Sequence, residues 1–172
     1  GIANAIQKIN PDVAFDYITS NTLTAEDEAV IRNADAVIVV VGTNSSYSAE
    51  DRDRTTIILP NNQAELISQV GGLNENTIAV METCGPMQVT AFEDDVAAIL
   101  GSSFSGIRKV GFGNVISGAV NPSGKVTATW HQNVNDNGDS DIPSIYNYNL
   151  YATNGDSGRT YMYYEGENDP SY

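Results

Sequence analysis

Residues 34–60 read ADAVIVVVGTNSSYSAEDRDRTTIILP, which joins an apolar run to a charged loop. It opens with a continuous apolar run, Ala36 to Val41, whose length and β-branched composition are typical of a strand buried on both faces of a parallel sheet. Such a strand indicates a layered α/β domain. The chain then breaks at Gly42 into a polar loop of about fifteen residues, long enough to be either functional or disordered.

The polar loop carries five consecutive charged residues, Glu50 to Arg54, which include both acids and bases. The sequence turns apolar again at Ile57. Open α/β sheets bind their ligands at the carboxyl ends of the strands, and this loop follows the carboxyl end of a predicted buried strand. We therefore take the charged loop as the candidate functional region.

Helix and strand patterns alternate on both sides of this stretch. Upstream we expect a helix over 2–9, a strand over 13–18, and a helix over 24–34 that is capped by Thr24 and Asp27. Downstream we expect a helix over 61–70 that Gly71-Gly72 stops, strands over 77–81 and 96–100, a helix within 107–116 and an edge strand over 125–130. The alternation predicts a three-layer α/β/α sandwich with a mainly parallel sheet and an extended C-terminal tail.

The composition shifts at His131 toward Asn, Asp, Gly, Ser and Tyr. We therefore place an α/β sandwich domain at 1–131 and an acidic tail, rich in Tyr and Asn, at 132–172. The tail has little apolar surface to bury by itself, so we expect it to pack on the domain. Within it only 159–164 has the pattern of an ordered, extended segment.

Charge and composition limit the partners. The 172 residues include 22 acidic and 8 basic side chains, which gives a formal charge of −14 and argues against nucleic acid, since phosphate binding needs Lys and Arg. No apolar stretch reaches transmembrane length, so we expect no membrane partner. Few Lys and many Asn, Ser and Thr predict a secreted protein. The start at Gly1, without Met, predicts a processed or excised piece.

Metal and cofactor chemistry have little support in the residues. The chain has one cysteine, Cys84, and one histidine, His131, so neither an internal disulfide nor a multi-His or cysteine-based metal cluster can be built. Oxygen ligands alternate from Asp136 to Asp141 as in the first half of a calcium loop, but the closing Glu is missing. We expect no metal and no cofactor.

Several short segments, taken in order, resemble the C-terminal domain of family 3 glycoside hydrolases, and most of all its β-xylosidase branch. They are ADAVIVVVGT from Ala34, the Ala-Glu-x-x-Asp-Arg pattern at 49–54, ILPxxQxxLI at 58–67, METCGP at 81–86, NPSGK at 121–125, TATW at 127–130 and GRTY at 158–161. None of these segments is specific by itself, whereas their order is, and together they cover most of the chain.

This resemblance implies a function. In that family an N-terminal (β/α)8 barrel carries an Asp nucleophile, and the α/β sandwich supplies an acid/base Glu, which matches Glu50 here. The implied activity is that of an exo-acting, retaining β-xylosidase or β-glucosidase on a β-linked oligosaccharide or polysaccharide. Asp53 and Arg54 then support the loop, through an ion pair or through arginine hydrogen bonds to backbone carbonyls. The residues alone also permit another interpretation, a solvated Glu50 paired with Arg52 or Arg54.

Departures from the family pattern favour a second hypothesis. The family's Gly-rich loop is replaced by 104–109, where a position that is acidic or polar in relatives is Arg108. The chain also lacks the first strand of the family's domain and the entire barrel, so the isolated chain is predicted to be inactive. The alternative is a non-catalytic carbohydrate-binding or spacer module of a secreted, multimodular protein that degrades plant polysaccharides.

Four residues are candidate sugar contacts, namely Tyr47, Phe104, Arg108 and Trp130. The aromatic rings of such residues can stack on the apolar face of a sugar. For each aromatic residue, and for the tyrosines of the tail, the alternative is burial in the core or under the tail.

Overall fold

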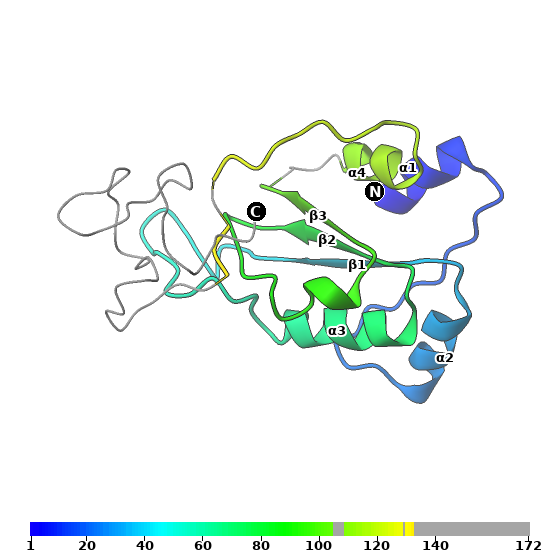
Figure 1. Ribbon diagram of the computed structural model, residues 1–172, viewed down its shortest axis with the longest axis horizontal. Coiled ribbons are helices and arrows are strands. Elements are labelled where there is room, and N and C mark those ends of the chain that lie inside the picture. Colours follow the sequence, from blue (N-terminus) through cyan, green and yellow to red (C-terminus); the bar gives the residue numbers. More distant parts are fainter. Residues whose placement is uncertain (105–108, 129, 133–172) are drawn as a thin grey trace.

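The structure is a computed structural model that describes residues 1–104, 109–128 and 130–132. It confirms the predicted α/β class, because a parallel sheet lies between helices on its two faces (Figure 1). Residues 133–172 lie outside the described residues. The domain boundary at 131 and the packing of the tail therefore remain predictions.

In the part of the chain that the structure describes, three strands form the sheet in the order β1-β2-β3: β1 spans Val37–Gly42, β2 spans Thr77–Glu82, and β3 spans Ala98–Ser102. All pairings are parallel, with Val37 opposite Thr77 and Ile78 opposite Ala98. The predicted strands at 36–41, 77–81 and 96–100 are confirmed with shifts of one or two residues. Because the strands are parallel, their carboxyl ends lie at one edge of the sheet (Figure 1).

Among the described residues, four α-helices flank the sheet. Two of them, α1 (Ile2–Ile9) and α4 (Val110–Ile116), pack together on one face. The other two, α2 (Ala25–Asn33) and α3 (Gln63–Leu73), pack against each other, and α3 covers the opposite face (Figure 1). A short 3₁₀ turn, η1 (Glu93–Asp95), precedes β3. The expected helices are therefore all present.

The main apolar core lies between α3 and the sheet. Alternate strand residues point to the same face, so Val39 and Val41 of β1 share this core with Ala79 and Met81 of β2 and Ile67 of α3. On the opposite face Val40 remains 54% exposed. The two faces of the sheet are thus covered to different degrees.

Gly113 of α4 allows close contact between α4 and α1. A methyl group at Gly113 would lie 2.4 Å from the Cβ of Ala5 in α1, so only glycine lets the two helices approach this closely. Glycine lowers helix propensity by about 1 kcal/mol relative to alanine. Packing against α1 offsets that cost.

The start of α2 confirms the predicted cap. The backbone N–H of Asp27 donates to the Thr24 hydroxyl at 3.2 Å, and the Thr24 N–H donates to the Asp27 carboxylate at 2.9 Å. The hydrogen bond from the Thr24 backbone is the larger cause, and the bond from its hydroxyl the smaller, that lowers the pKa of Asp27.

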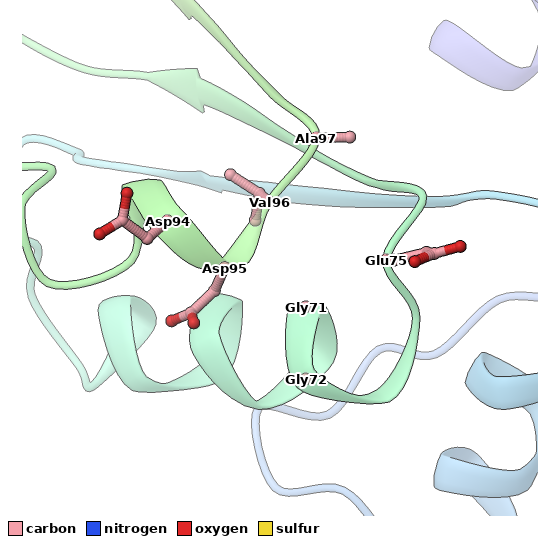
Figure 2. Close-up of a pocket in the computed structure, with 7 residues that line it drawn as sticks. All are labelled: Gly71, Gly72, Glu75, Asp94, Asp95, Val96 and Ala97. Carbon is pink, nitrogen blue, oxygen red and sulfur yellow. The ribbon is translucent and has the colours of Figure 1, made fainter.

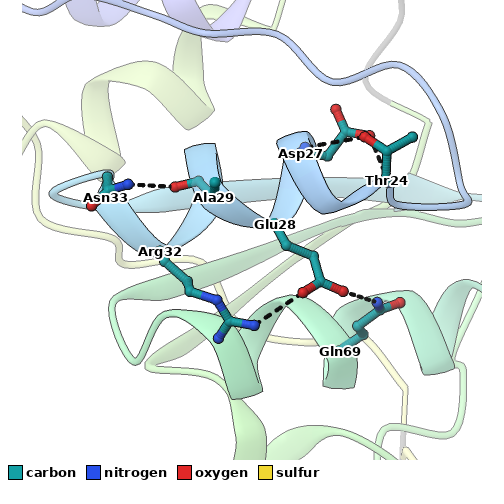
Figure 3. Close-up of polar contacts among 7 residues, drawn as sticks. All are labelled: Thr24, Asp27, Glu28, Ala29, Arg32, Asn33 and Gln69. Carbon is teal, nitrogen blue, oxygen red and sulfur yellow. Dashed lines mark hydrogen bonds and ion pairs between the residues drawn. The ribbon is translucent and has the colours of Figure 1, made fainter.

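Glu28 links α2 to α3. Its carboxylate accepts from Arg32 at 3.0 Å and from Gln69 of α3 at 3.4 Å (Figure 3).

Two predicted strands are wrong. Residues 13–18 form no strand; the rings of Phe15 and Tyr17 stack on each other at 6.2 Å, and Tyr17 is 73% exposed. Their alternation gives an extended chain without a ladder partner among the described residues. Likewise, the described part of 125–130 contains no strand, and its residues 125–128 are all exposed.

The predicted boundaries of the third helix are also wrong. Asn61 and Asn62 adopt left-handed φ angles of 59° and 55°, so α3 begins only at Gln63. Gly71 does not stop the helix; a methyl group there would lie 2.0 Å from the Asp95 carbonyl oxygen, so packing requires the glycine. The helix ends at Leu73, and the side chain of its C-cap residue, Asn74, donates to backbone carbonyls at the end of α2.

Candidate active-site loop

The charged loop, residues 43–59, leaves β1 at the carboxyl edge of the sheet (Figure 1). We call it the Glu50 loop. Its first residues are held from two sides: Gln63 exchanges two hydrogen bonds with the backbone of Gly42, at 2.7 and 3.0 Å, and the Thr43 hydroxyl accepts from the Cys84 N–H at 2.9 Å. The start of the loop is therefore fixed to α3 and to the segment that follows β2.

The tip of the loop is a tight turn. Ala49 and Arg52 exchange backbone hydrogen bonds of 3.0 and 3.1 Å, which places Glu50 and Asp51 at the two central positions. The Arg52 guanidinium donates to the Ser45 carbonyl at 2.6 Å and so ties the turn to the first part of the loop. The turn presents Glu50 to solvent.

Glu50 makes no ion pair with any residue that the structure describes. Both nearby arginines bind backbone carbonyls, so the pairing with Arg52 or Arg54 that the sequence also permitted is not formed. An exposed carboxylate at the tip of a turn is available to a partner molecule. Asp53, three residues farther on, is exposed as well.

Tyr47 closes the loop from within. Its hydroxyl lies 2.7 Å from the Thr56 carbonyl oxygen and 2.9 Å from that of Ile58, and its ring packs against the main core. Burial is the main cause that raises the pKa of Tyr47, against the opposing effect of the positive charge of Arg54. The hydroxyl thus stays a proton donor. The structure gives Tyr47 a role in loop closure, and its predicted sugar contact remains a prediction.

Arg54 fastens the loop to the sheet. Its guanidinium donates to the Pro86 carbonyl at 2.6 Å and lies 3.3 Å from the sulfur of Met87. Of the two arrangements expected for Arg54, an ion pair or a hydrogen bond to a backbone carbonyl, the structure contains the second. Pro86 and Met87 follow β2, so the bond joins the charged segment to the segment that leaves the central strand.

Two other predicted sugar contacts, Phe104 and Trp130, lie elsewhere along this edge. Phe104 follows β3 and is 57% exposed. Trp130 is partly buried against the main core, with its ring 3.5 Å from the position of a Cβ on Gly101. Arg108 lies outside the described residues. Its neighbour Lys109 forms an ion pair with Glu82 at the end of β2.

Sequence reasoning assigned no role to Gln63, Thr43 or Pro86, although all three hold the loop. The signal for Gln63 is its position in the first turn of the helix that follows the loop. The Pro86 carbonyl has no sequence signal, because every residue carries a backbone carbonyl.

A hollow lies at the amino ends of the strands, between α3 and η1, with a volume of about 320 Å³ (Figure 2). It is lined by Gly71, Gly72, Glu75, Asp94, Asp95, Val96 and Ala97. Figure 2 shows the side chains of Glu75 and Asp94 pointing in opposite directions, so these carboxylates do not converge on one point. Among the described residues no group of three His, Cys, Asp or Glu side chains is placed to hold a metal ion.

None of the helices in the described part of the chain combines the length and the apolar character that crossing a membrane requires.

The sequence matches a known family along most of its length. The profile of the family described as glycosyl hydrolase family 3 C-terminal domain matches residues 1–168. β-D-xylosidase 1 of Arabidopsis thaliana is 35% identical over 143 residues, which cover 81% of this chain and 18% of that protein. A β-glucosidase of Rhizobium radiobacter is 32% identical over 125 residues, which cover 71% of this chain and 15% of that protein. The chain thus spans less than a fifth of either relative.

Solved structures agree with the sequence match. A family 3 β-glucosidase from Neurospora crassa superposes with a TM-score of 0.67 at 28% identity, over 77% of this chain and 17% of that one. A family 3 exo-β-xylosidase in complex with a xylobiose aziridine activity-based probe superposes with a TM-score of 0.71 over 99% of this chain and 23% of that one. Its identity of 24% makes it an argument for the fold alone.

Proposed function

The chain belongs to the glycosyl hydrolase family 3 C-terminal domains, and from this premise we propose that it supplies the acid/base carboxylate, Glu50, to the active site of a retaining β-glycosidase. The complete enzyme is an exo-acting β-xylosidase or β-glucosidase of two domains. Its nucleophile lies on a (β/α)8 barrel, and its substrate is a β-linked oligosaccharide or polysaccharide. The names of the relatives support this substrate class.

The observation that carries the proposal is the placement of Glu50. It is exposed, it makes no ion pair with a described residue, and it occupies the tip of a loop whose start, closure and base are each hydrogen-bonded. Ligands of open α/β sheets bind at this same edge. A fixed and accessible carboxylate is what proton transfer to a bound substrate requires.

The chemistry assigns Glu50 two steps. First, the Glu50 carboxylic acid donates its proton to the glycosidic oxygen as the bond from C1 to that oxygen breaks and the nucleophile attacks C1. Glu50, now a carboxylate, then takes a proton from the water that attacks C1, which releases the sugar with its configuration retained. The two carboxyl groups must lie about 5–5.5 Å apart, and residues from different domains can meet this spacing. The chain by itself is therefore inactive.

A leaving-group series tests this role. In the full-length protein that carries this chain, we expect Glu50→Gln to lower kcat/KM about 10²–10⁴-fold for aryl β-xylosides or β-glucosides with poor leaving groups. Dinitrophenyl glycosides need little protonation, so we expect their glycosylation step to change far less. Asp94→Asn, at the opposite edge of the sheet, is the control and leaves both rates unchanged. Equal effects of Glu50→Gln on both substrates, or no effect, would contradict the proposal.

One observation favours a second function, a non-catalytic carbohydrate-binding or spacer module. Phe104 is 57% exposed where β3 ends, so its ring is available to stack on a sugar. On this alternative the isolated chain binds xylan or cello-oligosaccharides, and Phe104→Ala removes the binding. Titration of the isolated chain with both glycans decides this, because the catalytic proposal needs no such affinity.

We also propose that the protein is secreted, which its composition of few Lys and many Asn, Ser and Thr supports. Immunodetection of the native protein in the culture medium and in cell extracts compares the two locations. Enrichment in the medium is the expected result, and recovery only from the cell extract contradicts it.

A further inference from the structure

The side-chain hydrogen bonds of the Glu50 loop differ in the segments that they connect. Tyr47 connects to Thr56 and Ile58, and Arg52 connects to Ser45, so both side chains tie the loop to itself. Arg54 instead reaches Pro86, which is 32 residues away and follows β2. Within the charged segment, Arg54 is thus the described side chain whose hydrogen bond reaches the turn that follows β2, the central strand.

β2 is the most firmly held strand of the sheet. It pairs on both sides, with β1 and β3, and Ala79, Val80 and Met81 are at most 1% exposed. Strands of this kind open last in native-state fluctuations. A side chain bonded to Pro86 therefore takes its position from the segment that leaves this strand.

The turn after β2 is shaped to receive the guanidinium. A methyl group on Gly85 would lie 3.1 Å from one Nη atom of Arg54 and 3.5 Å from its Cζ, so the absence of a side chain leaves room for Arg54. Arg54 is partly buried there, whereas Arg52 is exposed. Removal of the guanidinium would leave the Pro86 carbonyl without this donor.

We propose that Arg54 is a positioning residue for the acid/base. By bonding to Pro86 it fixes the distance of Glu50, four residues earlier, from the carboxyl end of β2. The inference rests on the proposed function of Glu50. Proton transfer is sensitive to distance, and a misplacement of about 1 Å can cost about 10²-fold in rate. Arg54 touches no reacting atom, and its effect passes through the loop.

The test compares Arg54→Ala with Glu50→Gln in the full-length protein. We expect Arg54→Ala to lower kcat about 10–100-fold for aryl glycosides with poor leaving groups, with much smaller effects on dinitrophenyl glycosides and on KM. Arg54→Lys, whose ammonium group can also donate to a carbonyl, restores part of the rate. Arg32→Ala removes an exposed arginine from α2 and is the matched control, with no change in kcat.

A second variant covers the case in which Arg54→Ala does not fold. Gly85→Ala keeps Arg54 and displaces its guanidinium by a few tenths of an ångström. We expect a smaller loss than in Arg54→Ala, with the same preference for poor leaving groups. In both variants the thermal midpoint is measured, so that a loss of folded protein is separated from a loss of rate.

The outcomes distinguish the two proposals. If Glu50→Gln discriminates between leaving groups while the folded Arg54→Ala and Gly85→Ala variants do not, the positioning role of Arg54 is overturned and the role of Glu50 stands. If Glu50→Gln itself does not discriminate, both proposals fall. Discrimination in all three variants, in the order Glu50→Gln, Arg54→Ala, Gly85→Ala, supports both.

Discussion

At the carboxyl edge of the sheet, side chains hold the Glu50 loop in place. At the amino edge, the backbones of α3 and η1 lie in contact and leave a hollow between them. Tyr47, Arg54 and Gln63 each bond to backbone groups at the first edge. At the second edge, Gly71 of α3 lies against the carbonyl of Asp95. Acidic residues occur at both edges: at the carboxyl edge they lie on a hydrogen-bonded loop, and at the amino edge they line the hollow.

The difference shows that a hollow lined with acids is a weaker indication of chemistry than one acid on a fixed loop. Glu75 and Asp94 at the amino edge point apart (Figure 2). Glu50 shares the tip of its turn with Asp51, and the hydrogen bonds around the turn constrain where its backbone lies. Proton transfer requires a carboxylate in a defined position, and the proposed role of Glu50 depends on the hydrogen bonds that hold this loop.

Gly71→Ala disturbs the contact between α3 and η1 at the amino edge and leaves the Glu50 loop at the carboxyl edge unchanged. The new methyl group would meet the Asp95 backbone at 2.0 Å, so α3 or η1 must shift. We expect a loss of about 1–3 kcal/mol in the free energy of unfolding, measured by urea denaturation.

The neighbouring glycine is the control for this prediction. Gly72 also lies in α3 but has no atom within 4 Å of its would-be Cβ, so Gly72→Ala should stabilise the chain by about 0.4–1 kcal/mol. Kinetic constants of the full-length protein should not change in either folded variant. A loss of activity without unfolding in Gly71→Ala would show that the two edges are coupled.

Tyr47→Phe loosens the carboxyl edge from within. It removes the hydroxyl that bonds to Thr56 and Ile58, so we expect a loss of about 0.5–1.5 kcal/mol in stability. Hydrogen exchange of the amides in 44–58 should become faster, while exchange in α2 stays unchanged. Unchanged exchange in the loop would mean that the hydroxyl does not close it.

The same variant has a signature in alkaline solution. The pKa of folded Tyr47 is raised, so its contribution to stability is fully present below the unfolded-state value of about 10 and is lost as pH rises through the folded value. Tyr47→Phe lacks this titration. The stability difference between the chain and the variant should therefore shrink above about pH 10.

Asp27→Asn removes a carboxylate from the exposed cap of α2, away from both edges. We expect it to have the smallest effect on stability of these substitutions. The pKa of folded Asp27 is lowered, so its contribution is present above the unfolded-state value of about 3.9 and is lost as pH falls through the folded value. The stability difference between the chain and Asp27→Asn should thus be visible at pH 7 and vanish in strong acid. A constant difference across that range would contradict the capping role.

Local patterns predicted most of the fold. The β-branched run at Ala36 to Val41 gave β1, and Thr24 with Asp27 gave the start of α2, because in both cases the determining residues are adjacent in sequence. The strand predicted at 13–18 was wrong, since alternation indicates an extended chain but does not specify a partner strand. Gly71 was misread as a stop because its close neighbour, Asp95, is distant in sequence.

The candidate site was predictable only in part. The order of short motifs pointed to Glu50, and the structure places it at an exposed turn. The same motifs could not show that Tyr47 uses its hydroxyl inside the loop, or that Arg54 bonds to Pro86. These contacts depend on backbone carbonyls and on how the chain returns after β2, which carry no signature in side-chain pattern.

Rescue by azide tests the role of Glu50 most directly. In the full-length Glu50→Ala variant, a dinitrophenyl β-glycoside can still form the glycosyl-enzyme, but no base remains to activate water. Azide is an anionic nucleophile and needs no base, so it should restore turnover and yield a glycosyl azide of retained, β configuration. The unaltered enzyme should give only the free sugar. Absence of both rescue and β-glycosyl azide in a folded variant would contradict the assignment of Glu50 as the acid/base.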